Sequence, residues 1–307
     1  MATTTTPSTT PPVSAGGSPR TLAAPAGSWF DGPLRILPYV VLVLFTLPIV
    51  LLYAWLAYSS FFPRTEGLWP VGDFTLENWR FLWAPETVEQ LANKPPVIPL
   101  TINTLVFSLA TAAVVLLVSS MAGYALSRLH FPGRRTFLGS VLLLHSFPVV
   151  TLLIAVFMVL RQLGLYDRLL GVILVKAAFE LPLGIWIMKG FFDTIPWELE
   201  MAALVDGAGR FTTWWRVVMP LVRPGLLALG LLAFVSGWNE FFLPFVFMPS
   251  GSQATLSQLV RALLGEGRFV DYGVLTAVGL YYVAPVLLLF LFAQDQLMRI
   301  YGGGVKG

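Results

Sequence analysis

The chain has 307 residues, of which 56% are hydrophobic and only 11% are charged, a composition far more apolar than that of soluble domains. Several apolar runs reach the roughly 20 residues that a helix needs to cross a bilayer, so we expect an all-α polytopic membrane protein. The absence of cysteine excludes disulfides and thiolate metal sites, and a net charge of only +3 gives no support to nucleic-acid binding.

Residues 1–28 consist almost entirely of Thr, Pro, Ser, Ala and Gly, with a single charge at Arg20. Such a segment cannot bury a hydrophobic core, so we expect it to be disordered. It lacks the basic start and apolar centre of a secretory signal, which indicates a retained cytoplasmic tail. We expect the remaining residues, 29–307, to form the transmembrane domain.

Six apolar segments are predicted to span the membrane, namely residues 34–61, 98–126, 136–160, 169–191, 221–247 and 272–294. Of the 19 Lys and Arg residues, eleven lie in the loops and ends proposed to face inward and seven in the outer loops. Because positive charge is retained on the cytoplasmic side, both termini are predicted to be cytoplasmic. The last outer loop is expected to carry Glu266, Arg268 and Asp271.

Ionisable residues at membrane depth are costly and therefore serve as candidates for function. Lys176 and Glu180 lie four residues apart in the fourth span, on one face of the helix. They form either a charge pair on a translocation path or a structural pair between helices. Asn239 and Glu240 in the fifth span have the same two interpretations. His145 lacks a second ligand and is interpreted as a hydrogen-bonded packing histidine.

A polar stretch, residues 195–220, separates the fourth and fifth spans. Pro196 suits the first turn of a helix, and Glu198 and Glu200 lie near the positive end of the helix dipole. Gly207 is expected to end the helix in the left-handed conformation. One face of this short exposed helix is formed by residues spaced three and four apart: Leu199, Ala202, Ala203 and Asp206.

This polar stretch resembles the cytoplasmic coupling motif of ABC importer permeases, which is a Glu-Ala-Ala run followed by a glycine and, later, a hydrophobic-proline pair. Ala202, Ala203 and Gly207 match the motif, and Met219-Pro220-Leu221 stands at the later element. Met201 occupies the glutamate position of the motif, with Glu200 one residue earlier. Three further segments are similar to sugar-importer permeases of the maltose type: residues 74–79, 94–99 and 237–241. The Gly-rich end, residues 302–307, shares this similarity.

The resemblance implies the type I ABC permease fold, with six spans and a cytoplasmic coupling helix. It implies the second permease subunit of a maltose or maltodextrin importer in a bacterial cytoplasmic (inner) membrane. The implied partners are a homologous permease, two copies of an ATPase subunit and an extracytoplasmic sugar-binding protein. The residues implied to contact the ATPase are Glu198, Glu200, Met201, Ala202, Ala203, Asp206 and Gly207.

Catalysis is not expected of this chain, and no cofactor is expected. It contains no Gly-x-x-x-x-Gly-Lys-Ser/Thr phosphate loop, so ATP hydrolysis must belong to a partner. A membrane-embedded enzyme would need a motif that joins Glu180, Glu240 and His145, and none is present. An ion-coupled secondary transporter that uses Lys176 and Glu180 remains an alternative, as does a permease for another sugar or a glycerol-phosphate type of substrate.

Overall fold

The computed structural model describes residues 36–66, 69–88, 91, 94–265 and 272–302. The chain divides into two compact units, Met1–Tyr53 and Ala54–Gly307. The described part of the first unit is helical and belongs to α1 (Leu37–Ser59), which contains Pro48. The predicted disordered tail, the charged residues 266, 268 and 271 and the last five residues lie outside the described residues.

Among the described residues, four helices are long and apolar enough to cross a membrane. They are α1, α2 (Val97–Arg128), α5 (Leu169–Asp193) and the first part of α12 (Tyr272–Gly302), up to Gln294. Two bent pairs of helices raise the number of candidate spans to as many as six. The chain is therefore a helical, membrane-type protein with four to six candidate spans.

The predicted third span, residues 136–160, is not one continuous helix. It consists of α3 (Arg134–His145), a 3-10 turn η4 (Val149–Leu152) and α4 (Leu153–Gln162), with a bend of 96° between the two helical parts. Pro148 lies at the bend, where it has no N–H to donate and disfavours a helical conformation in the residue before it.

The predicted fifth span, residues 221–247, is also interrupted. α9 (Arg223–Trp238) ends at Trp238, and α10 (Phe242–Phe247) begins four residues later. At 1.5 Å per residue the 16 residues of α9 cover about 24 Å, less than the roughly 30 Å of a bilayer core. Before α9 lies a helical segment, inclined by 77° to it, that is made of α7 (Arg210–Thr213), the π-turn η5 (Trp214–Val218) and α8 (Met219–Leu221).

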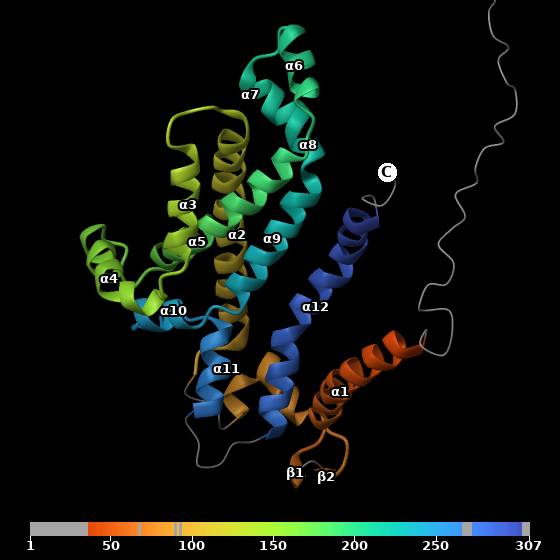
Figure 1. The fold of residues 1–307 in the computed structure, drawn as a ribbon. Helices are drawn as coiled ribbons and strands as arrows, with labels where there is room; N and C mark the ends of the chain where they lie inside the picture. The colour runs from red at the N-terminus through yellow and green to blue at the C-terminus, as the bar shows by residue number, and fades with distance from the viewer. Residues whose placement is uncertain (1–35, 67–68, 89–90, 92–93, 266–271, 303–307) are drawn as a thin grey trace, which may run out of the picture. The chain divides into compact units, whose positions relative to one another are not determined.

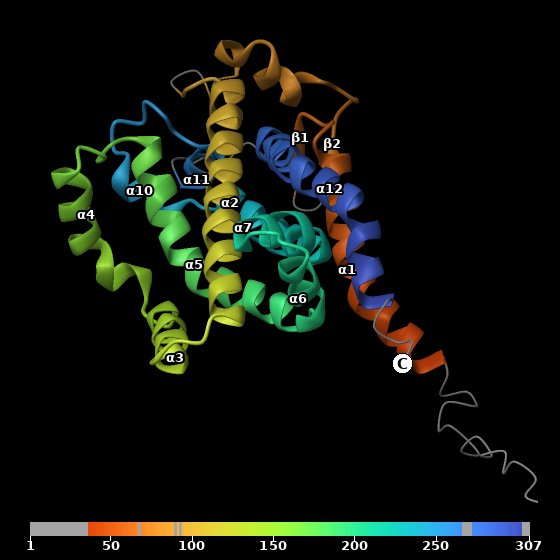
Figure 2. The same ribbon diagram turned by 90° about the horizontal axis from the view of Figure 1, so that it is seen from above.

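Helix α2 is the centre of the second unit, with α5 and α9 packed along it (Figures 1 and 2). α12 packs on α9, and α3 packs on α5. Small residues allow these close contacts: a Cβ atom added to Gly123 would lie 2.9 Å from the Cβ of Met188, and one added to Gly237 would lie 3.0 Å from the Cα of Ser108. This is the small-residue packing that joins helices within membranes.

The two long segments predicted as outer loops, one before α2 and one after α10, form a folded region at the Val97 end of α2. The region contains an antiparallel hairpin, two 3-10 turns and helix α11, none of which was predicted. Buried Asn78 donates hydrogen bonds to the carbonyls of Ser60 (3.1 Å) and Phe62 (2.7 Å). The elements are β1 (Arg64–Glu66), β2 (Trp69–Val71), η2 (Glu77–Leu82), η3 (Pro85–Thr87) and α11 (Leu256–Gly265).

Candidate functional site

The polar stretch after α5 forms the short helix expected from the sequence. Helix α6 extends over Trp197–Val205, directly after Pro196. Gly207 follows with a φ of +87°, the left-handed conformation that glycine adopts at little cost. Ala202 and Asp206 are exposed, and Val205 is 86% exposed. The helix thus presents its small and acidic side chains away from the rest of the chain.

Glu200 is the exception on α6, because its side chain points into the protein and is only 2% exposed. One carboxylate oxygen pairs with the guanidinium of Arg128, and the other accepts a hydrogen bond of 3.0 Å from the hydroxyl of Tyr124. Arg128 also donates to the carbonyl of Ile195 (2.9 Å) and lies over the ring of Trp197. The start of α6 is therefore fixed to the end of α2 by a buried, charge-assisted network.

A second contact joins the same end of α2 to α5. The hydroxyl of Ser127 donates to Asp193 at 2.6 Å, and Lys189 pairs with the other oxygen of that carboxylate. Arg128 and Ser127 together hold the end of α5 and the start of α6. By contrast, Met201 is only partly buried. Met201 occupies the motif's glutamate position and takes no part in this network. Glu200, one residue earlier, binds Arg128 and Tyr124 within the chain.

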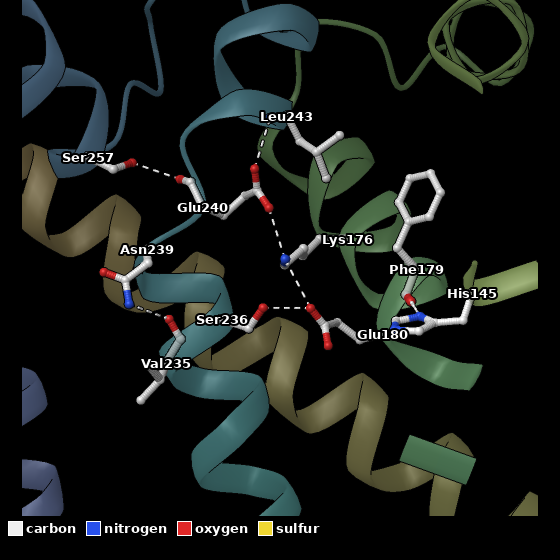
Figure 3. A network of polar contacts seen from close by, with 10 residues as sticks. All are labelled: His145, Lys176, Phe179, Glu180, Val235, Ser236, Asn239, Glu240, Leu243 and Ser257. Carbon is white, nitrogen blue, oxygen red and sulfur yellow. Dashed lines mark hydrogen bonds and ion pairs between the residues drawn. The ribbon is translucent and has the colours of Figure 1, made fainter. Parts of the chain in front are cut away.

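Three charged side chains meet deep between α5 and the break that follows α9 (Figure 3). The ammonium of Lys176 lies 3.0 Å from Glu180 and 2.9 Å from Glu240. The three side chains are between 12% and 20% exposed. Ser236 of α9 donates to the same oxygen of Glu180, at 2.5 Å. The expected Lys176–Glu180 pair forms, and Glu240 gives this charge cluster a second carboxylate.

The break between α9 and α10 places Glu240 in the cluster. The backbone N–H of Leu243 donates to the second oxygen of Glu240 (3.1 Å), so this side chain satisfies a free donor in the first turn of α10. The hydroxyl of Ser257 donates to the Glu240 carbonyl at 2.7 Å. At the break, the backbone N–H of Leu243 and the carbonyl of Glu240 are thus each satisfied by a side chain. Irregular backbone at membrane depth requires such partners.

Asn239 is directed away from its neighbour Glu240. Its amide donates to the carbonyl of Val235 (3.0 Å), and its oxygen lies 3.1 Å from the hydroxyl of Tyr282 on α12. The same hydroxyl lies 3.0 Å from the Trp238 carbonyl, while the indole N–H of Trp238 donates to the Tyr282 carbonyl (3.0 Å). Asn239 therefore takes part in a contact between helices α9 and α12, separate from the charge cluster.

His145 lies at the end of α3, where one ring nitrogen is 3.3 Å from the carbonyl of Phe179 on α5 (Figure 3). This is the single hydrogen-bonded role expected for it. Within the part of the chain that the structure describes, His145 forms no hydrogen bond or ion pair with Lys176, Glu180 or Glu240.

The family model of the binding-protein-dependent transport system inner membrane component matches residues 116–299. That range includes α6, its glycine and the charge cluster. The chain belongs to this family.

Curated relatives agree with this assignment. The permease is 36% identical to the putative ABC transporter permease protein ORF1 of Streptomyces antibioticus, over 71% of this chain and 96% of that protein. It is 33% identical to the trehalose transport system permease protein SugB of Mycobacterium tuberculosis, over 67% of this chain and 76% of that protein. It is 32% identical to the sulfoquinovosyl glycerol transport system permease protein SmoH of Agrobacterium fabrum, over 91% and 96%.

The fold of the permease is similar to that of a chain in the crystal structure of a bacterial ABC transporter involved in the import of alginate. The TM-score is 0.73 at 22% identity, over 89% of this chain and 99% of that chain. This likeness extends the family assignment to the fold. The six-span count and the coupling role of α6 remain predictions.

Sequence analysis missed four residues that complete these sites: Tyr124, Arg128, Ser236 and Tyr282. Arg128 was counted only as an inward-facing positive charge. Its partner Glu200 is 72 residues away along the chain, and no local pattern indicates such a pair. The one signal in the sequence is that Glu200 falls on the opposite face of α6 from Ala202 and Asp206. That spacing alone does not show which of the two faces is buried.

Proposed function

We propose that this permease is a transmembrane subunit of an ATP-driven importer for carbohydrate, and that it couples to the ATPase through residues 196–210. The observation that carries the proposal is the exposed helix α6, whose start is fixed to the end of α2 by Arg128, while Ser127 holds the end of α5 to the same end of α2. A helix held in this way transmits a push as a rigid body to two candidate spans.

The mechanism requires that the ATPase contact α6 differently in its open and closed states, because only a difference in contacts shifts a conformational equilibrium. Closing of the ATPase dimer would move α6, and α2 and α5 would follow. The side chains proposed to contact the ATPase are exposed Glu198, Ala202 and Asp206 together with half-buried Met201 and Ala203. Gly207 would set the direction in which the chain leaves the helix. Glu200 would contribute from within by fixing the helix.

The proposed complex contains a homologous permease, two ATPase subunits and an extracytoplasmic sugar-binding protein, in a bacterial cytoplasmic membrane with both termini inside. Support comes from the family description and from a solved neighbour with a TM-score of 0.58, an alginate transporter in complex with a periplasmic protein bound to an alginate pentasaccharide. Residues 1–28 would be a tail, and residues 29–307 the permease domain.

The proposed substrate is maltose, maltodextrin or a related oligosaccharide. Relatives are named for trehalose, sulfoquinovosyl glycerol, diacetylchitobiose and, at 30% identity, the maltodextrin system of Streptococcus pneumoniae. Their common feature is a glycosidic, hydroxyl-rich molecule. Lys176, Glu180 and Glu240 would supply donors and acceptors to sugar hydroxyls on the translocation path, with Asn239 nearby.

The test is a reconstituted complex of this permease with its partner permease, ATPase and binding protein. We expect ATP hydrolysis that rises when the binding protein is loaded, and uptake of labelled sugar that stops without ATP. Competition by a series of maltodextrins, trehalose and chitobiose would then rank the substrates. Uptake that follows a proton gradient in the absence of ATP would contradict the proposal and favour an ion-coupled carrier built on Lys176 and Glu180.

A further inference from the structure

Two hollows lie side by side between α3 and α5, near the end of α2 that binds α6. The first has a volume of about 610 Å³ and is lined mainly by polar and basic residues, with Arg134, Arg135 and Lys189 among them. The second, of about 540 Å³, is mainly apolar and is lined by Trp186, Phe191 and their neighbours. Leu138 and Lys189 line both hollows, so the two adjoin each other.

The basic hollow has uncompensated positive charge. Lys189 pairs with Asp193, but the guanidinium groups of Arg134 and Arg135 form no hydrogen bond or ion pair with any part of the chain that the structure describes. Three cations therefore face one carboxylate, and His130 adds a further polar ring at the rim. Such a site favours a ligand with negative charge and several acceptor oxygens.

The second hollow is longer along α5 than the first, which touches α5 only at Lys189. Leu138 lies one helical turn beyond Arg134 along α3, which at 1.5 Å per residue is about 6 Å further from that end of the helix. The second hollow extends along α5 from Thr194 back to Trp186, which is eight residues or about 12 Å. The apolar hollow is therefore an elongated groove along α5, and the basic hollow adjoins it at Leu138 and Lys189.

A cationic hollow that adjoins an apolar groove matches an amphiphile whose charged end is negative. Lys189 lines both hollows, and lysines at membrane interfaces combine an apolar stem with a charged end in the same way. Basic pockets between membrane helices also bind the headgroups of anionic lipids in other proteins.

We propose that the α3–α5 cleft binds an anionic glycerophospholipid. Its phosphate contacts Arg134, Arg135 and Lys189, and one acyl chain follows Leu138, Trp186 and Phe191. The bound lipid would lie in the hollows beside the α3–α5 contact. This proposal does not depend on the identity of the transported substrate.

The experiment uses the complex that this permease forms, purified in detergent through a tag on this chain and titrated with phosphatidylglycerol. We expect saturable binding that phosphatidylcholine does not reproduce. Arg134→Gln with Arg135→Gln should weaken it about 25-fold, taking each surface arginine as about fivefold. The control is Arg161→Gln with Arg168→Gln, which also removes two positive charges. Arg161 lies in the last turn of α4 and Arg168 directly before α5, at the end of α5 that is far from Lys189, so binding should be unchanged.

Two further measurements distinguish the ligand. Inorganic phosphate alone should compete weakly, and Leu138→Asp should weaken phosphatidylglycerol binding while circular dichroism and elution volume of the complex stay as in the parent. Competition by inorganic phosphate as strong as by the lipid would overturn the lipid assignment in favour of a simple anion site. Equal weakening by both arginine pairs, or an absence of saturable binding because a partner subunit covers the cleft, would overturn it as well.

Discussion

At the scale of single residues, Lys176 is the group on which two acidic side chains depend. Removing one partner from a buried ion pair costs about 3–5 kcal/mol, because the remaining charge stays desolvated, whereas replacing the whole group by apolar residues is often nearly neutral. Glu180 and Glu240 both lose their cation if Lys176 is replaced, but Lys176 keeps a carboxylate if only one of them is replaced. The three residues should therefore not be equally sensitive.

We predict that Lys176→Met lowers the yield of assembled complex more than Glu180→Gln does. The double variant Lys176→Met with Glu180→Leu should recover only in part, because it leaves Glu240 unpaired. Adding Glu240→Gln should bring the yield close to that of the parent. The measurement is the yield of monodisperse complex in detergent, followed by uptake in vesicles.

Uptake then separates the two interpretations of the cluster. A triple variant that assembles and transports sugar shows a structural group, and one that assembles without transport places the cluster on the translocation path. Arg161→Met, which removes an exposed cation, is the matched control and should behave as the parent. If Lys176→Met and Glu180→Gln also behave as the parent, the three groups are not a buried cluster.

A second prediction concerns Arg128 and Glu200. Glu200→Ala should weaken association with the ATPase, because α6 loses its attachment to α2. Arg128→Gln should reproduce this effect, although Arg128 is not part of α6. Met201→Ala should have a smaller effect than Glu200→Ala. The reverse order would show that apolar packing against the ATPase has replaced the motif's carboxylate. Co-purification of the ATPase and the ratio of ATP hydrolysed to sugar transported are the readouts.

The outcome for Arg128→Gln decides what Glu200 does. A normal association in Arg128→Gln together with a loss in Glu200→Ala would mean that the carboxylate contacts the ATPase itself. Equal losses in both, with a partial recovery on exchanging the two residues, would show that the pair positions the helix.

At the scale of elements, the sequence predicted those features whose causes are local. Helix α6 and its end could be located because a proline, acidic residues and a glycine act within a few positions. The bend between α3 and α4 also had a local signal in Pro148, but a proline inside a membrane span is often tolerated, as Pro48 in α1 illustrates. The break after Trp238 depends on Glu240, Ser257 and their partners, which only the tertiary structure brings together.

Gly207 supports a prediction at this scale. Its φ of +87° is strained for a β-branched residue, and a Cβ atom there would meet nothing within 4 Å, so backbone strain alone opposes Gly207→Val. We expect a cost of about 1–2 kcal/mol, a changed exit from α6 and ATP hydrolysis that no longer drives uptake. Gly207→Asn should retain more coupling, because asparagine visits this conformation. The measurement is the ATP-to-sugar ratio in proteoliposomes.

Gly209 provides the control for this substitution. It lies in the same turn with an equally open surrounding, but its φ of −70° is one that valine adopts readily. Gly209→Val should therefore couple nearly as well as the parent. Normal coupling in Gly207→Val would refute the role assigned to the left-handed turn at Gly207.

At the scale of the whole molecule, the absence of cysteine makes the orientation directly measurable. We predict that a cysteine at Val205, which is 86% exposed, reacts with a membrane-impermeant maleimide only in inverted vesicles. A cysteine at Trp69, which is 79% exposed at the other end of the fold, should react in spheroplasts. Labelling with the opposite pattern would reverse the proposed orientation, and labelling of both sites from one side would contradict the proposed spans.

The general class of the molecule was accessible from sequence because apolar runs and charge bias are properties of composition. The arrangement around α2 was not, since it depends on contacts between residues far apart in the chain. Tyr124 and Glu200 are 76 residues apart, and Trp238 and Tyr282 are 44 residues apart. Pairs of this kind decide which polar groups are satisfied, and a single sequence does not indicate them.

The buried bond between Arg128 and Glu200 has a consequence for how this permease and its relatives diverge. Position 200 is constrained by the chain's own fold, so a change there requires a matching change at position 128, and the two should be inherited as a pair. Position 201 has no such hydrogen bond in the described part of the chain, and in the proposed complex it could change together with the ATPase. Across relatives we therefore expect residues 128 and 200 to change together, and residue 201 to vary independently of both.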